Sequence, residues 1–278
     1  MHSLIETEEL QARLGEPELR IIDCRFQLGD PVYGPERYAA GHIPGAVYAH
    51  LDTDLSSPII PGKTGRHPLP DPERLAARLR AWGVSRDSEV VAYDDGNAAY
   101  AGRVWWLLRW LGHTRVRVLN GGWTRWCALG GRQSQTVPRP APGDFTGTPD
   151  WTRVVGAEDV LAHLGDAGRV LLDARAAPRF RGEVEPIDPV AGHIPGALCA
   201  EFSENLAPDG RFKESAALGA RFAGFDVNNR EVVCYCGSGV TACNNILAAT
   251  LAGLPEPKLY AGSWSEWITD PARPIARA

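Results

Sequence analysis

One cysteine stands in a loop whose composition suits chemistry on sulfur. Residues 236–242 read CGSGVTA and follow an apolar run that ends at Tyr235. Glycines permit unusual backbone dihedrals, so that successive N–H groups can point toward one centre. Such donors, together with the positive end of a following helix, stabilise an anion. The pattern predicts that Cys236 is available as a thiolate and acts as a nucleophile.

The other five cysteines lack this setting. Cys234 lies within a predicted strand, and Cys243 lies within a predicted helix. A metal site at positions 234, 236 and 243 is disfavoured, because neighbouring strand residues point to opposite faces and no histidine is close in sequence. Buried cysteines usually act as small apolar residues. Packing roles are therefore predicted for Cys24, Cys127, Cys199, Cys234 and Cys243.

Short apolar runs and helical periodicities alternate along the chain. The runs lie at residues 21–23, 90–93, 170–173 and 232–235, and they are typical of buried parallel strands. Apolar residues at helical spacing occur at 75–82 and 104–111, and a further helix is expected just after the CGSGVTA loop. Strands separated by helices predict parallel sheets, whose ligand sites lie at the carboxyl ends of the strands. The segments after Tyr93 and Tyr235 are therefore the places to look for a site.

An internal repeat divides the chain into two halves. The hexapeptide GHIPGA occurs at residues 41–46 and again at 192–197, an offset of 192 − 41 = 151. A repeat of this length is too long for a solenoid unit and indicates a duplicated domain. A Pro-rich and Gly-rich stretch at 131–150 separates the halves. We predict a first domain over 1–130, a linker over 131–150 with the boundary near residue 145, and a second domain over 151–278.

Composition excludes several classes of protein. The 278 residues carry a net charge of −5, which argues against general nucleic-acid binding because phosphate neutralisation needs a surplus of Lys and Arg. The apolar runs are too short to span a membrane. The first nine residues do not resemble a signal peptide. Six cysteines without a secretion signal are expected to be free thiols in a reducing cytoplasm.

The chain resembles the tandem-domain rhodanese-like sulfurtransferases along nearly its whole length. The resemblance rests on the repeated GHIPGA, on the loop 236–242 and on residues 260–267, which read YAGSWSEW. It implies an α/β fold of two rhodanese-like domains, each a mainly parallel sheet flanked by helices, with catalysis in the second. In the first domain Asp94 stands at the place that matches Cys236, which agrees with an inactive first half.

The resemblance also implies a reaction. Cys236 would accept a sulfane sulfur from a small donor as a persulfide and pass it to a thiol or to cyanide. The loop looks like that of the mercaptopyruvate type, because thiosulfate-preferring relatives usually carry basic residues where this chain has Gly237 and Ser238. The expected donor is therefore 3-mercaptopyruvate. A thioredoxin-like reductant is a further expected partner, and no cofactor or metal is expected.

Several site residues follow from the same resemblance. Ser238 would work with His67 and Asp52 of the first half in moving a proton, with Asp54 as a substitute for Asp52. Arg179 matches the arginine that binds the substrate carboxylate, whereas Ile187 stands where many mercaptopyruvate enzymes have a second arginine. No role is assigned to Arg181. The backbone of the loop would complete the substrate site through Gly237, Gly239, Val240 and Thr241.

Three other functions are considered. Thiosulfate:cyanide sulfur transfer is the first alternative. A non-catalytic sulfur-relay protein, which delivers a persulfide to a protein partner, is the second. A cysteine phosphatase would need an arginine six positions after the cysteine to clamp phosphate, and this chain has Ala242 there.

Two further groups of residues are assigned to the fold. His42 and His193 lie in the repeated hexapeptide of both halves, so they are predicted to be structural. A tryptophan-rich stretch is expected to serve helix packing and the domain interface and not a cofactor site. It comprises Trp105, Trp106, Trp110, Trp123 and Trp126.

Overall fold

The computed structural model describes residues 3–277, which form two compact units. Unit 1 comprises residues 3–57, Pro70–Asp150 and Pro208–Phe212. Unit 2 comprises Pro58–Leu69, Trp151–Ala207 and residues 213–277. Each half of the sequence thus contributes a short segment to the unit built mainly by the other half. The predicted domain boundaries, which cut the chain only once, stay a prediction.

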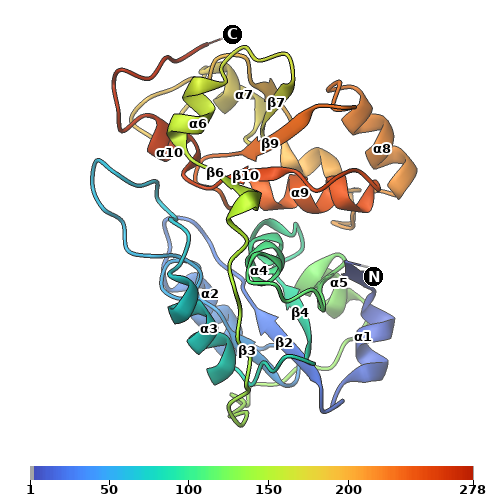
Figure 1. Cartoon of the computed structure of the whole chain (residues 1–278). Coiled ribbons are helices and arrows are strands. Elements are labelled where there is room, and N and C mark those ends of the chain that lie inside the picture. The colour runs from blue at the N-terminus through green and yellow to red at the C-terminus, as the bar shows by residue number, and fades with distance from the viewer. Residues whose placement is uncertain (1–2, 278) are drawn as a thin grey trace. The chain divides into compact units, whose positions relative to one another are not determined.

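Unit 1 contains a five-stranded parallel sheet in the order β1-β5-β4-β2-β3. Figure 1 labels three of its strands, β2, β3 and β4. The strands are β1 (Leu4–Ile5), β2 (Leu19–Asp23), β3 (Ala46–Tyr48), β4 (Glu89–Tyr93) and β5 (Val116–Leu119). The helices are α1 (Thr7–Arg13), α2 (Tyr33–Ala40), α3 (Pro72–Ala81), α4 (Ala99–Trp110) and α5 (Gly122–Ala128). Residues 131–150 belong to this unit and contain no helix or strand, and Phe145 among them is buried.

Unit 2 repeats this topology, with the strand order β6-β10-β9-β7-β8 and all pairings parallel. The strands are β6 (Val154–Val155), β7 (Arg169–Asp173), β8 (Leu198–Cys199), β9 (Glu231–Tyr235) and β10 (Lys258–Tyr260). The α-helices are α6 (Ala157–Ala162), α7 (Ala177–Arg181), α8 (Ser215–Ala223), α9 (Ala242–Leu251) and α10 (Ser263–Trp267). Two short 3₁₀ helices are η1 (Trp151–Arg153) and η2 (Phe202–Asn205).

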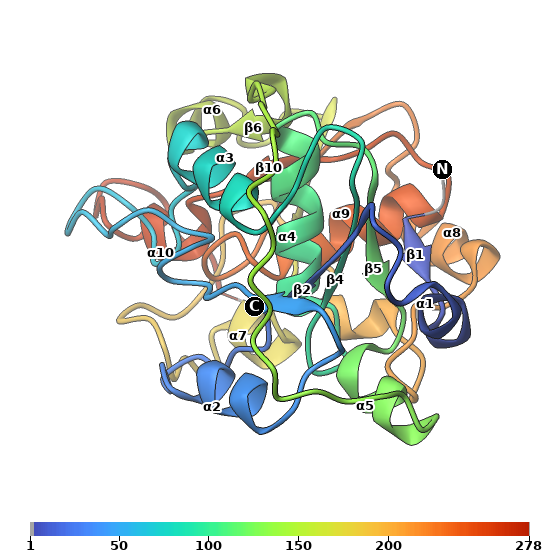
Figure 2. The ribbon, with the colours of Figure 1, turned by 90° about the horizontal axis from the view of Figure 1, so that it is seen from below.

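The predicted fold class, two parallel sheets each flanked by helices, is confirmed. The four apolar runs form β2, β4, β7 and β9, and the expected helices are α3, α4 and α9. Helix α4 lies along β4 and β5 (Figure 2), and its tryptophans Trp105, Trp106 and Trp110 are fully buried, so their predicted packing role is confirmed. None of the helices in the described part of the chain has the length and hydropathy needed to span a membrane.

Apolar layers on both faces hold the sheet of unit 2. One layer joins the strands to α6, α7 and α10 through Val160, Phe180 and Trp264. On the other face α9 packs on β9 and β10, and α8 packs on α9. Because β9 is the central strand, the loop between β9 and α9 starts from the most constrained part of the unit.

The two repeated histidines have equivalent structural contacts. His42 stacks on Tyr38 with the ring centroids 4.0 Å apart, and its Nδ1 lies 2.8 Å from the Tyr38 carbonyl oxygen. His193 stacks on Phe180 at 3.8 Å, and its Nδ1 lies 2.7 Å from the Phe180 carbonyl oxygen. These contacts support the interpretation that both histidines fix a helix against the following GHIPGA turn.

Candidate active site

Cys236 lies at the carboxyl end of β9, in a loop that backbone contacts hold tightly. Its Sγ accepts a hydrogen bond from the Gly239 N–H at 3.1 Å, and only 2% of the residue is exposed. The Cys236 N–H donates to Ser263 Oγ at 3.1 Å, and the Cys236 carbonyl accepts from the Trp264 N–H at 3.0 Å. These contacts therefore hold the sulfur atom beside the Gly239 N–H, shortly before the start of α9.

Gly239 allows the chain to close over the sulfur. Its φ is +75°, a region that favours glycine, and a Cβ there would collide with the Ala261 carbonyl oxygen. The N–H groups of Val240 and Thr241 donate to no acceptor within residues 3–277. These two donors are available to an anion bound beside Cys236.

The other cysteines are unsuited to nucleophilic chemistry. Burial raises the pKa of the Cys24, Cys127, Cys199 and Cys234 thiols, which keeps them protonated near neutral pH. Cys243 lies within α9, where its Sγ donates to the Gly239 carbonyl oxygen at 3.4 Å. These contacts support the packing roles predicted for all five.

The structure brings Ser238 and His67 together. Ser238 Oγ lies 2.7 Å from His67 Nδ1, and both residues are buried. The segment Pro58–Leu69 comes from the first half of the sequence but belongs to unit 2, so the contact lies within one unit. A hydroxyl two residues after Cys236, held by an imidazole, can deliver a proton beside the sulfur.

Asp52 and Asp54 belong to unit 1. Asp52 is exposed, and its N–H donates to His50 Nδ1 at 3.1 Å. Asp54 accepts from the His50 N–H at 2.9 Å and pairs with Arg78 at 2.9 Å. Asp54 therefore has a structural role in its own loop, and a part for Asp52 in proton transfer stays a prediction.

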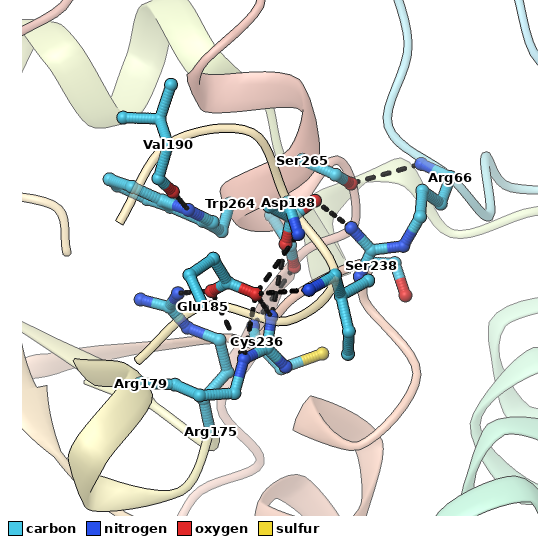
Figure 3. Close-up of polar contacts among 12 residues, drawn as sticks. Arg66, Arg175, Arg179, Glu185, Asp188, Val190, Cys236, Ser238, Trp264 and Ser265 are labelled. Carbon is cyan, nitrogen blue, oxygen red and sulfur yellow. Dashed lines mark hydrogen bonds and ion pairs between the residues drawn. The ribbon is translucent and has the colours of Figure 1, made fainter. Parts of the chain in front are cut away.

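Arg179 lies near the loop and is held by two carboxylates (Figure 3). Its Nε and Nη2 donate to Glu185 at 3.1 and 2.7 Å, and Nη2 also donates to Asp188 at 3.1 Å. Burial would raise the pKa of Glu185, but hydrogen bonds from Arg179 and from the Asp188 N–H bring it below its ordinary value. Glu185 is thus a fixed negative charge that orients Arg179.

Sequence reasoning missed Arg66, whose guanidinium pairs with Asp188 beside the loop. A Cβ on Gly237 would lie 2.8 Å from Arg66 Nη2 and 3.7 Å from Arg179 Nη1, so both cations border this glycine. The comparison of the loop with thiosulfate-preferring relatives found Gly237 and Ser238 where those relatives carry basic residues. It considered only the residues next to Cys236 in sequence, whereas these cations arrive from 66 and 179. The sequence did offer one indication of Arg66, because it directly precedes His67, which was already a predicted site residue.

Comparison with known proteins places this chain in a family. Residues 6–129 and 156–270 both match the family described as Rhodanese-like domain. A Pseudomonas aeruginosa protein named "Probable 3-mercaptopyruvate sulfurtransferase" is 56% identical over 277 residues, which cover 98% of this chain and 97% of that protein. The chain belongs to the tandem-domain rhodanese-like sulfurtransferases.

Two further relatives bear on the donor. A Mycobacterium tuberculosis protein named "Putative thiosulfate sulfurtransferase SseB" is 42% identical and covers 99% of this chain and 96% of its own length. The crystal structure of SseA from Escherichia coli, described as a 3-mercaptopyruvate sulfotransferase with the rhodanese fold, aligns with a TM-score of 0.83 and 34% identity. That alignment covers 96% of this chain and all of the other. Relatives of both donor types thus resemble this sulfurtransferase.

Serines outside the CGSGVTA loop also fix this rhodanese-like site. Ser263 is fully buried, with a φ of +56°. Its Oγ accepts a hydrogen bond from the Cys236 N–H, and its hydroxyl donates to the Tyr260 carbonyl oxygen at 2.9 Å. Ser265 Oγ accepts from the Arg66 N–H at 3.0 Å, and the Ser265 N–H donates to the Gly237 carbonyl at 2.9 Å. Serines are common in loops, so the sequence alone gave no reason to select these two.

Proposed function

We propose that this sulfurtransferase moves a sulfane sulfur from 3-mercaptopyruvate to a thiol or to cyanide through a persulfide on Cys236. The observation that carries the proposal is the 2.7 Å contact between Ser238 Oγ and His67 Nδ1, two residues from Cys236. Release of pyruvate requires a proton at carbon, and this pair can supply one. Thiosulfate needs no such proton, because its sulfite product leaves as an anion.

The reaction takes two steps. The Cys236 thiolate attacks the donor sulfur, an S–S bond forms, and the C–S bond breaks with its electron pair on carbon. The resulting enolate takes a proton through Ser238 and becomes pyruvate. Cyanide or a thiolate then attacks the outer sulfur, the S–S bond breaks, and Cys236 leaves as a thiolate again. The N–H groups of Gly239, Val240 and Thr241 stabilise the sulfur anion in both steps.

Arg179 binds the donor carboxylate in this proposal. Glu185 and Asp188 hold its Nε and Nη2, so the guanidinium keeps one orientation beside Gly237. Asp52 assists His67 in moving the proton. Catalysis belongs to the second domain, and the first domain is inactive.

Thiosulfate is the second candidate donor. Two guanidiniums border Gly237, and two cations suit a dianion. The Mycobacterium tuberculosis relative is also named as a putative thiosulfate sulfurtransferase. Sulfur relay to a protein partner, with a thioredoxin-like reductant as one acceptor, is the third candidate.

Location in the cytoplasm stays a prediction that cell fractionation can check.

A comparison of kcat/KM for 3-mercaptopyruvate and thiosulfate on one preparation tests the proposal. With cyanide as acceptor and thiocyanate as the measured product, we expect the higher kcat/KM with 3-mercaptopyruvate. A higher value with thiosulfate would establish the second candidate. Persulfide formation without turnover of small acceptors would establish the relay.

A further inference from the structure

Two guanidiniums, and not one, face the residue next to the nucleophile. A Cβ on Gly237 would lie 2.8 Å from Arg66 Nη2 and 3.7 Å from Arg179 Nη1. Any side chain at 237 would displace Arg66, so glycine keeps this place open. A ligand that binds both nitrogens would lie one residue from Cys236.

The carboxylates around the two arginines leave these nitrogens available. Asp188 lies between the arginines and takes Arg66 Nη1 with one oxygen and Arg179 Nη2 with the other (Figure 3). Glu185 takes Nε and Nη2 of Arg179. Within residues 3–277, Arg66 Nη2 and Arg179 Nη1 donate to no acceptor, and Arg66 Nε is buried without a partner. The two Nη nitrogens are therefore available to an acceptor bound beside Gly237.

The backbone of Arg66 is tied to the catalytic loop. The Arg66 N–H donates to Ser265 Oγ at 3.0 Å, and the Ser265 N–H donates to the Gly237 carbonyl at 2.9 Å. Gly65 packs against the Gly262 carbonyl with no room for a Cβ. Arg66 is therefore placed by the same contacts that place the CGSGVTA loop, and it is not a mobile surface cation.

We infer that Arg66 is a donor-binding residue, which grips the carboxylate of 3-mercaptopyruvate together with Arg179. Its Nη2 and the Arg179 Nη1 bind the carboxylate, while Asp188 positions both guanidiniums by sharing its oxygens between them. Arg66 thus supplies the second cation that Ile187 does not provide. The inference rests on the proposed function.

Substitution of Arg66 tests this assignment. In Arg66→Gln we expect KM for 3-mercaptopyruvate to rise about 10–100-fold while kcat changes less than about threefold, because ground-state binding is lost. Arg179→Gln should give a rise of the same order. Arg66→Lys should lie between Gln and wild type, since it keeps the charge and loses the planar fork. The matched control is Arg181→Gln, an exposed arginine of unit 2 paired with Glu183, which should keep the wild-type KM.

A second measurement separates donor binding from a structural role. Persulfide-loaded Arg66→Gln, prepared with saturating donor and desalted, should react with cyanide within about twofold of the wild-type rate, because the donor carboxylate has left. An unchanged KM, or a slowed cyanide step together with a lowered Tm, would overturn the inference. If Arg66→Gln does not fold, an unchanged KM in Arg66→Lys overturns it. A wild-type chain that uses thiosulfate alone would instead overturn the proposed donor, and with it this assignment.

Discussion

In unit 1 the central strand β4 is followed by Asp94, and in unit 2 the central strand β9 is followed by Cys236. The backbones at these two points are matched. The Asp94 carbonyl accepts from the Trp123 N–H at 2.8 Å, and the Cys236 carbonyl accepts from the Trp264 N–H at 3.0 Å. In both units a helix begins a few residues later, so both loops gather N–H groups at a positive helix end.

The two loops differ in what their N–H groups bind. The Asp94 carboxylate is buried and accepts four backbone hydrogen bonds of 2.9–3.1 Å, from Gly96, Ala98, Tyr100 and Ala101. Cys236 Sγ accepts one from Gly239, and the N–H groups of Val240 and Thr241 stay available within the described residues. In unit 1 the carboxylate of Asp94 occupies the N–H groups of the loop, whereas in unit 2 two of the corresponding groups have no acceptor within the described residues, as expected if an anion binds there.

The two units share one buried ion pair near these loops but differ in the charges around it. Asp23 and Arg25 in unit 1 form the same buried pair as Asp173 and Arg175 in unit 2, at 2.7 and 2.6 Å. In both units the arginine Nη2 also donates to a glycine carbonyl at 2.7 Å, which braces the GHIPGA turn. Within the described residues only Arg175 pairs with a second carboxylate, that of Glu185 at 3.4 Å. Both units therefore contain the same buried ion pair, and in unit 2 Glu185 links it to Arg179.

The largest effect on activity is expected from replacing Cys236, the residue of unit 2 that corresponds to Asp94. Cys236→Ser should lower turnover by more than about 10³-fold and abolish the gain of one sulfur atom in the intact mass after donor treatment, because no other thiol can form the persulfide. Cys199→Ser, a half-buried thiol of the same unit, should keep both properties. Substantial turnover in Cys236→Ser would show that the chemistry lies elsewhere.

The hydroxyl of Ser238 should matter for one donor only. Ser238→Ala should lower kcat with 3-mercaptopyruvate by about 10–100-fold and leave thiosulfate nearly unchanged, because only the enolate needs a proton. The matching position of unit 1 is Gly96, which has no hydroxyl to offer. Ser203→Ala, an exposed serine of unit 2, should affect neither donor. Equal losses with both donors would contradict the proton-transfer role.

The smallest effect on activity is expected from the matching residue of unit 1. Asp94→Ala should change kcat/KM by less than about twofold, yet it should lower the free energy of unfolding by about 2–4 kcal/mol, because four buried N–H groups lose a charged acceptor. Urea unfolding and steady-state kinetics measure the two effects. Asp87→Ala, an exposed aspartate of the same unit, should leave both unchanged. A large loss of activity with unchanged stability would contradict this comparison, because it would show that the Asp94 loop also contributes to the reaction.

The sequence alone determined the duplication, the four strands β2, β4, β7 and β9, and the loop of Cys236. These features depend on neighbouring residues, since an apolar run makes a buried strand and glycines before a helix make an anion cradle wherever they occur. It also named Ser238 and His67 through a family resemblance, and the structure places them 2.7 Å apart. The role of Asp52 was named in the same way and is still a prediction.

Only the tertiary structure decided which charges surround the nucleophile. Arg66 and Asp188 are 122 positions apart, and no local pattern indicates that they pair. The sequence matched Asp94 to Cys236 by position, but only the structure shows that four N–H groups converge on the Asp94 carboxylate. Strands and glycine loops follow from backbone preferences that act over a few residues. The partner of a charged side chain follows from the path of the whole chain, because only folding brings distant charges within hydrogen-bonding distance.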